Sequence, residues 1–412
     1  MKRIELIDAL RGFALLLILL FHSYDGFGTG VNAGGDKFKI AGLDPFVTQF
    51  MYLIVIGKAF AIFSIMFGFS FFIQMDRSSI KGENFSLVFA RRLLILLIIG
   101  YLHALVYRGD ILTKYAVIGF LLLLLSRFNS RILGVLAVLL LLQIPQIFSI
   151  IQSTNMPAGD LTTSGTLASP DNTGVWEGIL AAYTGGSFID VIRVNALSAF
   201  YEIWKLNILS GRILLIAGYF ILGLLLGRTR FFENIDKYRK YLKYFILGGA
   251  IIYGALRLLR SRLGSSPEFS PYTRELISVL LNDYMDIFFT VILLSAFILI
   301  YHNSIARRVL DLLVPYGRMG LTSYVSQGLI GVFVFYGFGL AFFRYSAPLF
   351  SVIIGLGILA VQLIFSHFWL KYYTYGPIEW VWRSLTYPKK NIPLKRSSGQ
   401  HHSGKQQSTD KG

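Results

Sequence analysis

Apolar residues occur along this chain in long runs separated by polar connections, and strict alternation of apolar and polar positions is scarce. Runs at 117–125, 132–151 and 286–300 approach the roughly 20 residues that cross about 30 Å of hydrocarbon as a helix. Continuous runs favour helices over a barrel, so the pattern predicts an all-α, polytopic integral membrane bundle. Ten spans are expected, centred near residues 15, 63, 98, 119, 141, 218, 249, 293, 331 and 360.

The composition agrees with a membrane protein. Of 412 residues, 55% are hydrophobic and 15% are charged, and no cysteine is present. The lack of cysteine excludes disulfides, thiolate nucleophiles and cysteine-ligated metals, and no HExxH, P-loop or GxGxxG motif occurs. The expected partners are therefore a lipid bilayer and a small molecule, with no nucleic acid, no metal and no tightly bound cofactor. A homodimer is left open.

Lysine and arginine in the connections predict the orientation. Basic residues recur on alternate connections, at 77–92, 127–131, 228–243, 307–308 and from 371 onward. By the positive-inside rule this pattern places both termini in the cytoplasm. One connection assigned to the outside does not fit the positive-inside pattern, because it carries four arginines: Arg257, Arg260, Arg262 and Arg274.

The connections divide the chain into four regions. Residues 1–151 and 210–387 are expected to form two membrane halves of five helices each. Between them, 152–209 opens with turn-forming residues and continues into mixed apolar and polar sequence, which predicts an extracytoplasmic loop with interfacial helices. Residues 388–412 are polar and basic, which predicts a disordered cytoplasmic tail.

Ionisable residues inside the predicted spans are the candidates for function, since charged groups are costly in hydrocarbon. Arg11 and His22 are eleven residues apart, close to three helical turns, so they share one helix face about 16 Å apart along the axis. Arg92 and His103 repeat this spacing, again with the arginine on the inner side. Two helices therefore each carry a fixed cation at one depth and a titratable base at another.

A tight turn, YRGD at 107–110, follows the second histidine. Asp110 can cap the next span and lies one helical turn before Lys114. If the first, third and fourth spans pack together, five side chains gather at one external level: His22, His103, Arg108, Asp110 and Lys114. A carboxylate beside a histidine orients the imidazole as a general base, so His22, His103 and Asp110 are the candidate catalytic residues.

Other polar residues in or beside the spans are candidates for substrate binding, because cations at the inner level suit phosphates. The set comprises Asp8, Arg11, Lys58, Arg92, Arg108, Lys114 and Gln327. The alternative is structural: arginines that follow the positive-inside bias, lysines that snorkel or pair, and a glutamine that bonds across helices. Near the C-terminus, Glu379 and Arg383 stand at helical spacing on either side of Trp380 and Trp382, which predicts an ion-paired cytoplasmic surface helix that closes the bundle.

Several blocks of this chain resemble the bacterial YeiB-like membrane proteins, which carry a C-terminal domain of unknown function 418. They are RIELIDALRGFALL at the start, KAFAIFSIMFGFSF at 58–71, ARRLLILLIIGYLHALVYRGDILTKYAVIG at 90–119, YGRMGLTSYVSQGLIGVFVFYGFGL at 316–340 and FSHFWLKYYTYGPIEWVWRSLTY at 365–387. The blocks span nearly the whole chain. The resemblance implies a multi-pass protein of the bacterial cell (inner or plasma) membrane.

The first helix also resembles that of transmembrane acyltransferases, including the acyltransferase-3 and heparan-glucosaminide N-acetyltransferase types. In the former, an arginine and a histidine separated by ten residues mark the site, and Arg11 and His22 match that pattern. The resemblance implies transfer of an acyl group from cytoplasmic acyl-CoA to an extracytoplasmic hydroxyl or amine. The alternatives are a transporter or exporter of a small molecule, or a noncatalytic membrane protein.

Overall fold

The computed structural model describes residues 4–31, 33–35, 38–80, 85–154 and 173–396. These residues form helices joined by turns, together with an isolated backbone bridge between Tyr373 and Lys395. The prediction of an all-helical fold is confirmed.

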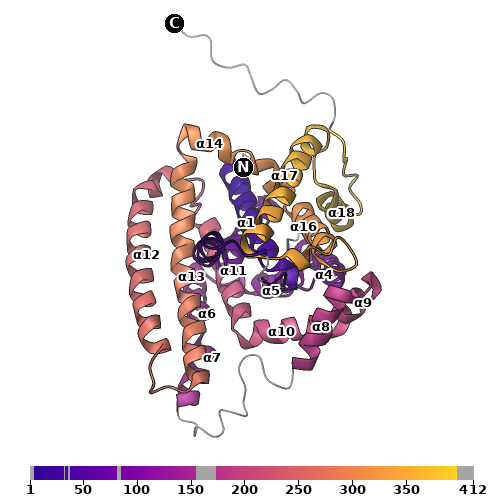
Figure 1. Ribbon diagram of the computed structural model, residues 1–412. Coiled ribbons are helices and arrows are strands. Elements are labelled where there is room, and N and C mark those ends of the chain that lie inside the picture. The colour runs from indigo at the N-terminus through magenta and orange to yellow at the C-terminus, as the bar shows by residue number, and fades with distance from the viewer. Residues whose placement is uncertain (1–3, 32, 36–37, 81–84, 155–172, 397–412) are drawn as a thin grey trace.

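The helices follow one another along the whole described chain (Figure 1). In order they are α1 (Glu5–Tyr24), η1 (Gly26–Gly28), α2 (Leu43–Phe50), η3 (Met51–Val55), α3 (Lys58–Ile80), α4 (Phe85–Val106), α5 (Leu112–Leu125), α6 (Ser130–Leu141), α7 (Ile144–Thr154), α8 (Thr173–Gly185), α9 (Phe188–Val194), η6 (Asn195–Ala199), α10 (Phe200–Leu209), α11 (Arg212–Arg228), α12 (Ile235–Gly264), α13 (Pro271–Tyr301), α14 (Ser304–Leu310), α15 (Leu313–Arg318), α16 (Gly320–Phe335), η7 (Phe342–Tyr345), α17 (Pro348–Tyr372) and α18 (Pro377–Thr386).

Seven helical segments in the described residues are long and apolar enough to cross a membrane, and eight if a pair bent by 70° counts as one span. The bent pair joins Phe188–Leu209 to α11. Every predicted centre falls in one of these segments or in the shorter apolar helices α5 and α16. Because α5 has 14 residues and α16 has 16, they fall short of a straight span, and the count by length is lower than the predicted ten. The orientation stays a prediction.

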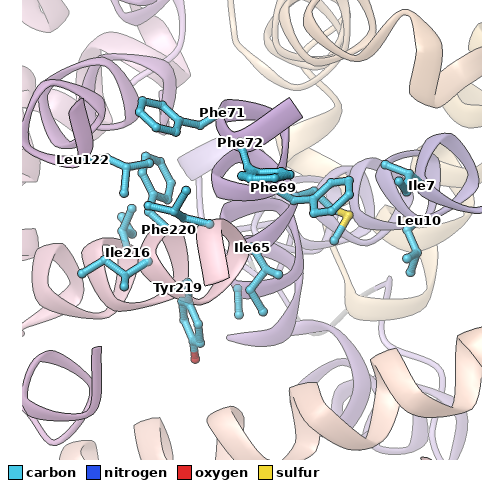
Figure 2. Close-up of a cluster of buried hydrophobic side chains, with 14 of the residues drawn as sticks. Ile7, Leu10, Ile65, Phe69, Phe71, Phe72, Leu122, Ile216, Tyr219 and Phe220 are labelled. Carbon is cyan, nitrogen blue, oxygen red and sulfur yellow. The ribbon is translucent and has the colours of Figure 1, made fainter. Parts of the chain in front are cut away.

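The core forms where α1, α3, α5 and α11 meet, and Figure 2 shows side chains from all four helices in one apolar cluster. The rings of Phe67 on α3 and Phe220 on α11 stack 4.5 Å apart. On the other side of α1, Gly12 and Gly317 leave no room for a side chain, since a Cβ at either would overlap the backbone of α15 or α1. These glycines let α1 and α15 pack at close range, which keeps α1 in the interior of the bundle.

The two ends of the bundle differ in their elements. In Figure 1 the N-terminus and α14 lie at one end, and α8 and α10 lie at the other. The segment 152–209, predicted as an extracytoplasmic loop with interfacial helices, contains α8, α9, η6 and α10 over residues 173–209. Residues 155–172 lie outside the described residues.

Part of the segment assigned to the C-terminal tail contacts the end of α17. The backbone N–H of Thr374 donates to the carbonyl of Leu394 at 2.9 Å, and that of Arg396 donates to the carbonyl of Tyr372 at 3.1 Å. Residues 397–412 lie outside the described residues.

Candidate functional site

His103 and Asp110 form a buried pair at the junction of α4 and α5. His103 Nδ1 lies 2.9 Å from Asp110 Oδ1, and the two side chains are 1% and 2% exposed. The other carboxylate oxygen accepts from the Thr113 N–H at 2.8 Å, so Asp110 caps the first turn of α5 as its position predicts. The Lys114 ammonium donates to the Asp110 carbonyl at 2.5 Å. One aspartate thus fixes the imidazole and the start of the next helix.

His22, at the end of α1, is joined to this pair through Tyr107. The Tyr107 hydroxyl lies 2.5 Å from His22 Nδ1, and the Tyr107 ring centroid lies 4.9 Å from that of His22 and 5.8 Å from that of His103. Burial raises the pKa of Tyr107 well above its usual value, so the phenol keeps its proton and donates it to His22 Nδ1 in the tautomer that leaves this nitrogen unprotonated. Sequence reasoning missed Tyr107, although it opens the YRGD turn.

The second nitrogen of His103 faces α16. His103 Nε2 is buried without a hydrogen-bond partner, and a Cβ added at Gly328 would overlap it. When the Nδ1 proton is donated to Asp110, Nε2 carries the free lone pair. The lack of a side chain at Gly328 therefore leaves room for His103 Nε2.

Arg108 belongs to the same turn but makes its contacts elsewhere. Its guanidinium donates to the Gly28 carbonyl at 2.9 Å and lies over the rings of Trp176 and Tyr183 on α8, 5.3 and 5.5 Å from their centroids. Burial raises the pKa of Asp25, after α1, to about 6, although the Arg108 cation opposes the rise. Arg108 thus links the turn to α8 and to the segment after α1 rather than to the imidazoles.

A cavity of about 520 Å³ lies at the opposite end of α1 and α4 from the histidines. Its wall follows α1 from Ile4 to Arg11 and α4 from Phe89 to Leu96. Five arginines line it, accompanied by the carboxylates of Asp8 and Glu379: Arg11, Arg77, Arg92, Arg318 and Arg383. Another part of the wall is apolar and aromatic, formed by Phe63, Phe67, Leu96, Leu112 and Tyr115. Cations beside an apolar wall suit an anionic amphiphile.

Three of the lining residues, Asp8, Arg11 and Arg92, are predicted substrate-binding residues. Arg11 bonds Asp8 Oδ1 at 3.0 Å and Ser70 Oγ at 2.6 Å. The Arg92 guanidinium lies 4.1 Å from the ring centroid of Trp382 on α18. Sequence reasoning missed Arg77, Arg318 and Arg383 as cavity residues, because their convergence depends on how α3, α15 and α18 pack.

The predicted ion pair on α18 is wrong. Glu379 Oε1 accepts from the backbone N–H groups of Leu321 and Thr322, at 2.6 and 3.1 Å, and Glu379 Oε2 accepts from the Thr322 hydroxyl at 2.5 Å. Arg383 instead lies over the Tyr375 ring, 4.5 Å from its centroid. Burial raises the pKa of Glu379, and the Thr322 hydrogen bonds oppose the rise. The N–H groups at the start of α16, which have no partner within that helix, attract the carboxylate more than the half-buried Arg383 guanidinium does.

Two predicted binding residues do not line the cavity. Lys58 contacts Asp286 of α13 at 2.5 Å and donates to the Tyr52 carbonyl at 2.8 Å. Gln327 Oε1 accepts from the Tyr316 hydroxyl at 3.4 Å, and its Nε2 is buried without a partner. Both residues make contacts between helices, as expected from the alternative interpretation that they have a structural role.

Neither imidazole lines the cavity, but α4 and α5 contribute residues both to the cavity wall and to the His103–Asp110 pair. His103 follows the lining residue Leu96 by seven positions, about 10 Å along α4, and the lining residue Leu112 is two positions after Asp110. Within the described residues, no group of three or more histidine, aspartate or glutamate side chains is arranged to hold a metal.

Comparison with known proteins identifies relatives that are named as uncharacterised proteins. Residues 226–389, from the end of α11 through α18, match the family described as "Protein of unknown function (DUF418)". The chain is 28% identical to "Uncharacterized protein YxaH" of Bacillus subtilis (strain 168) over 94% of each chain. It is 25% identical to "Uncharacterized protein YeiB" of Escherichia coli (strain K12), over 94% of this chain and 97% of the relative. No solved structure matches the chain.

The chain therefore contains a segment that matches DUF418 and has bacterial homologues along nearly its full length. Its multi-pass membrane character rests on the seven or eight candidate spans in the described residues. The matched segment contributes Arg318, Glu379 and Arg383 to the cavity. His22, His103 and Asp110 lie before it, in the N-terminal half.

Proposed function

We propose that this protein is a membrane acyltransferase that binds an acyl-CoA in the arginine-lined cavity and transfers the acyl group to an extracytoplasmic hydroxyl or amine. The observation that carries the proposal is the cavity itself, where five arginines and an apolar wall lie next to each other. Arginine binds phosphate oxygens through paired N–H donors. The apolar wall suits an acyl chain, so one cavity offers contacts for both ends of the donor.

The histidine cluster supports the acceptor half of the proposal. Asp110 holds the His103 ring through Nδ1, and Nε2 is left to accept a proton, which is the arrangement of an oriented general base. Tyr107 and His22 lie beside it and supply a second imidazole. An imidazole whose tautomer is fixed can remove the proton of an acceptor hydroxyl or amine as that acceptor attacks the thioester.

The reaction balances without a further reagent. The acceptor oxygen or nitrogen attacks the thioester carbonyl carbon while the imidazole takes its proton. The carbon–sulfur bond then breaks, and the thiolate of coenzyme A leaves and receives that proton. The path from Leu96 to His103 is about two helical turns, so the donor must extend along α4 beyond the cavity.

A second candidate, a small-molecule transporter, is favoured by the broken helices. Backbone breaks with positive φ occur at Gly57, Gln143 and Gly211, and the segments around Gly211 are bent by 70°. Discontinuous helices inside a bundle are common where transporters bind substrates and ions.

The test is an acyl-CoA turnover assay on the purified, detergent-solubilised protein with candidate hydroxyl and amine acceptors. An enzyme releases free coenzyme A in detergent, whereas a transporter needs a sealed membrane to produce a measurable flux. The matched control is the His103→Gln variant, which keeps a polar side chain but cannot act as a base. Release that is absent in detergent while solute flux occurs in proteoliposomes would reject the enzyme and favour transport.

A further inference from the structure

The arginine-lined cavity carries more positive charge than its own carboxylates can balance. Among the described residues, five guanidinium groups and two carboxylates line it, which leaves an excess of three positive charges. Asp8 is paired with Arg11 at 3.0 Å, and both oxygens of Glu379 are bonded to the start of α16. Neither carboxylate is therefore left to balance the other arginines.

Three of the lining arginines come from three different helices. They are Arg77 near the end of α3, Arg92 in α4 and Arg383 in α18. Within the part of the chain that the structure describes, none of these three side chains forms an ion pair. Like charges brought to one cavity repel each other, so an anion bound among them is favourable.

The surroundings of Arg92 show the imbalance most clearly. This residue is 8% exposed, and burying a cation without a paired anion is costly. Its guanidinium lies 4.1 Å from the ring centroid of Trp382, and the Tyr387 hydroxyl is a polar neighbour. An aromatic ring and a hydroxyl offset only part of the cost, and the Arg383 cation adds repulsion. A buried arginine in this setting favours an anionic ligand.

The size of the charge excess distinguishes between classes of anion. A fatty-acid carboxylate carries a single negative charge and leaves most of the excess unbalanced. A phosphate monoester carries about two negative charges near neutral pH, and its oxygens accept paired N–H bonds from guanidinium groups. The apolar part of the wall then suits the remainder of an amphiphilic molecule. The cavity therefore fits a polyanionic phosphate group better than a carboxylate.

An anion at these arginines also affects how α18 packs. Two hydrogen bonds join α18 to α4: Trp382 Nε1 donates to the Arg92 carbonyl at 2.8 Å, and the Arg91 guanidinium donates to the Thr386 carbonyl at 3.3 Å. A phosphate group that bonds to both Arg92 and Arg383 adds a further link between the two helices and offsets the repulsion between these cations. Ligand binding should therefore stabilise the packing of α18 against α4.

We propose that Arg77, Arg92 and Arg383 form a subsite for a polyanionic phosphate group, and that a ligand bound there holds α18 against α4. The inference rests on the proposed function, because it assigns one part of the same donor cavity. It also gives the DUF418 segment a role, since that segment supplies α18 whereas α3 and α4 precede it. The phosphate can belong to coenzyme A or to the headgroup of an anionic lipid, which share this chemistry.

The first experiment measures the thermal unfolding temperature of the purified full-length protein in a neutral detergent as sodium pyrophosphate replaces NaCl at constant ionic strength. A ligand that binds only the folded state raises this temperature in a saturable way. Coenzyme A and dioctanoyl phosphatidic acid, titrated in the same way, distinguish the two sources, because the natural source should saturate at the lower concentration. The proposal is overturned if none of the three phosphate compounds raises the unfolding temperature.

Substitutions then locate the subsite. Arg92→Ala and Arg383→Ala should each raise the half-saturating pyrophosphate concentration by about tenfold or more, because each removes a charged hydrogen-bond donor to the phosphate. Arg91→Ala is the matched control, since Arg91 is adjacent to Arg92 and also bonds to α18 but does not line the cavity. It should keep the wild-type half-saturation. Equal changes in all three variants, or no change in any of them, would contradict the assignment.

A second measurement needs no variant. Hydrogen exchange of the wild-type protein reports the local stability of α18 (Pro377–Thr386), and its backbone amides should exchange more slowly with pyrophosphate or coenzyme A present. Protection of α18 without release of coenzyme A from any acyl-CoA would support the subsite and reject acyl transfer. Release of coenzyme A without protection of α18 would overturn the subsite and leave acyl transfer standing.

Discussion

His103 Nδ1 and Asp110 Oδ1 lie 2.9 Å apart across the turn that joins α4 to α5. The contact joins residues seven positions apart and places an oriented imidazole where α4, α5 and α16 meet. An aspartate in this position fixes the tautomer of the histidine and also caps α5. The same two side chains therefore serve both the proposed chemistry and the local fold.

The first prediction separates those two roles. His103→Gln and Asp110→Asn, alone and combined, should each lower coenzyme A release by roughly 10²- to 10⁴-fold, with the double variant no worse than the poorer single one. Non-additive loss at normal expression and unfolding temperature indicates a unit that acts in turnover. Independent additive losses, or a loss confined to folded protein, argue against a catalytic pair.

The second prediction concerns pH and Asp25. Burial raises the pKa of Asp25 to about 6 from a usual value of 3.8, so ionising it disfavours the folded state increasingly as pH rises from about 4 through 6. Asp25→Asn removes this penalty. The variant should unfold at a higher temperature than the wild type above about pH 6, and the gain should vanish as pH falls towards 4. A gain that is constant across this range would contradict the assignment.

The third prediction tests the contact between α18 and α16. Glu379→Ala leaves the N–H groups of Leu321 and Thr322 without their carboxylate and should reduce the free energy of unfolding by about 1–3 kcal/mol. Glu379→Gln retains one acceptor oxygen and should lose less. Thermal unfolding in detergent measures both. Equal stability of Glu379→Ala and the wild type would show that α18 does not depend on this contact.

The fourth prediction concerns orientation, which rests on the basic connections alone. The chain has no cysteine to interfere with labelling. Cysteines introduced at the exposed positions Glu177 in α8 and Ser304 in α14 should react with a membrane-impermeant maleimide from the outside and the inside respectively. Reaction of both from one side would contradict the predicted arrangement.

The sequence predicted those parts of the site that depend on spacing within one helix or turn. The distance from Arg92 to His103 and the position of Asp110 before Lys114 both follow from helical geometry, and the structure brings His22, His103, Asp110 and Lys114 together as expected. Local spacing was informative because the residues of each pair are separated by only a few helical turns.

Relations between distant segments could not be predicted in this way. Lys58 is paired with Asp286 and Glu379 caps α16, and both depend on which helices become neighbours. Spacing on α18 suggested a bond from Glu379 to Arg383, but the buried N–H groups of α16 compete for the same carboxylate. A single sequence gives no information on that competition.

The last prediction uses Arg11 and His22, which lie on one helix but in different parts of the protein. Arg11 lines the cavity, whereas His22 contacts Tyr107 at the other end of α1. Arg11→Ala should therefore weaken acyl-CoA binding, while His22→Ala should leave binding nearly intact and lower turnover by roughly 10²- to 10⁴-fold. Titration calorimetry with acyl-CoA and a thiol-release assay measure the two effects. If His22→Ala keeps full turnover in a folded protein, the similarity of α1 to the arginine–histidine acyltransferases carries no function, and transport becomes the better explanation.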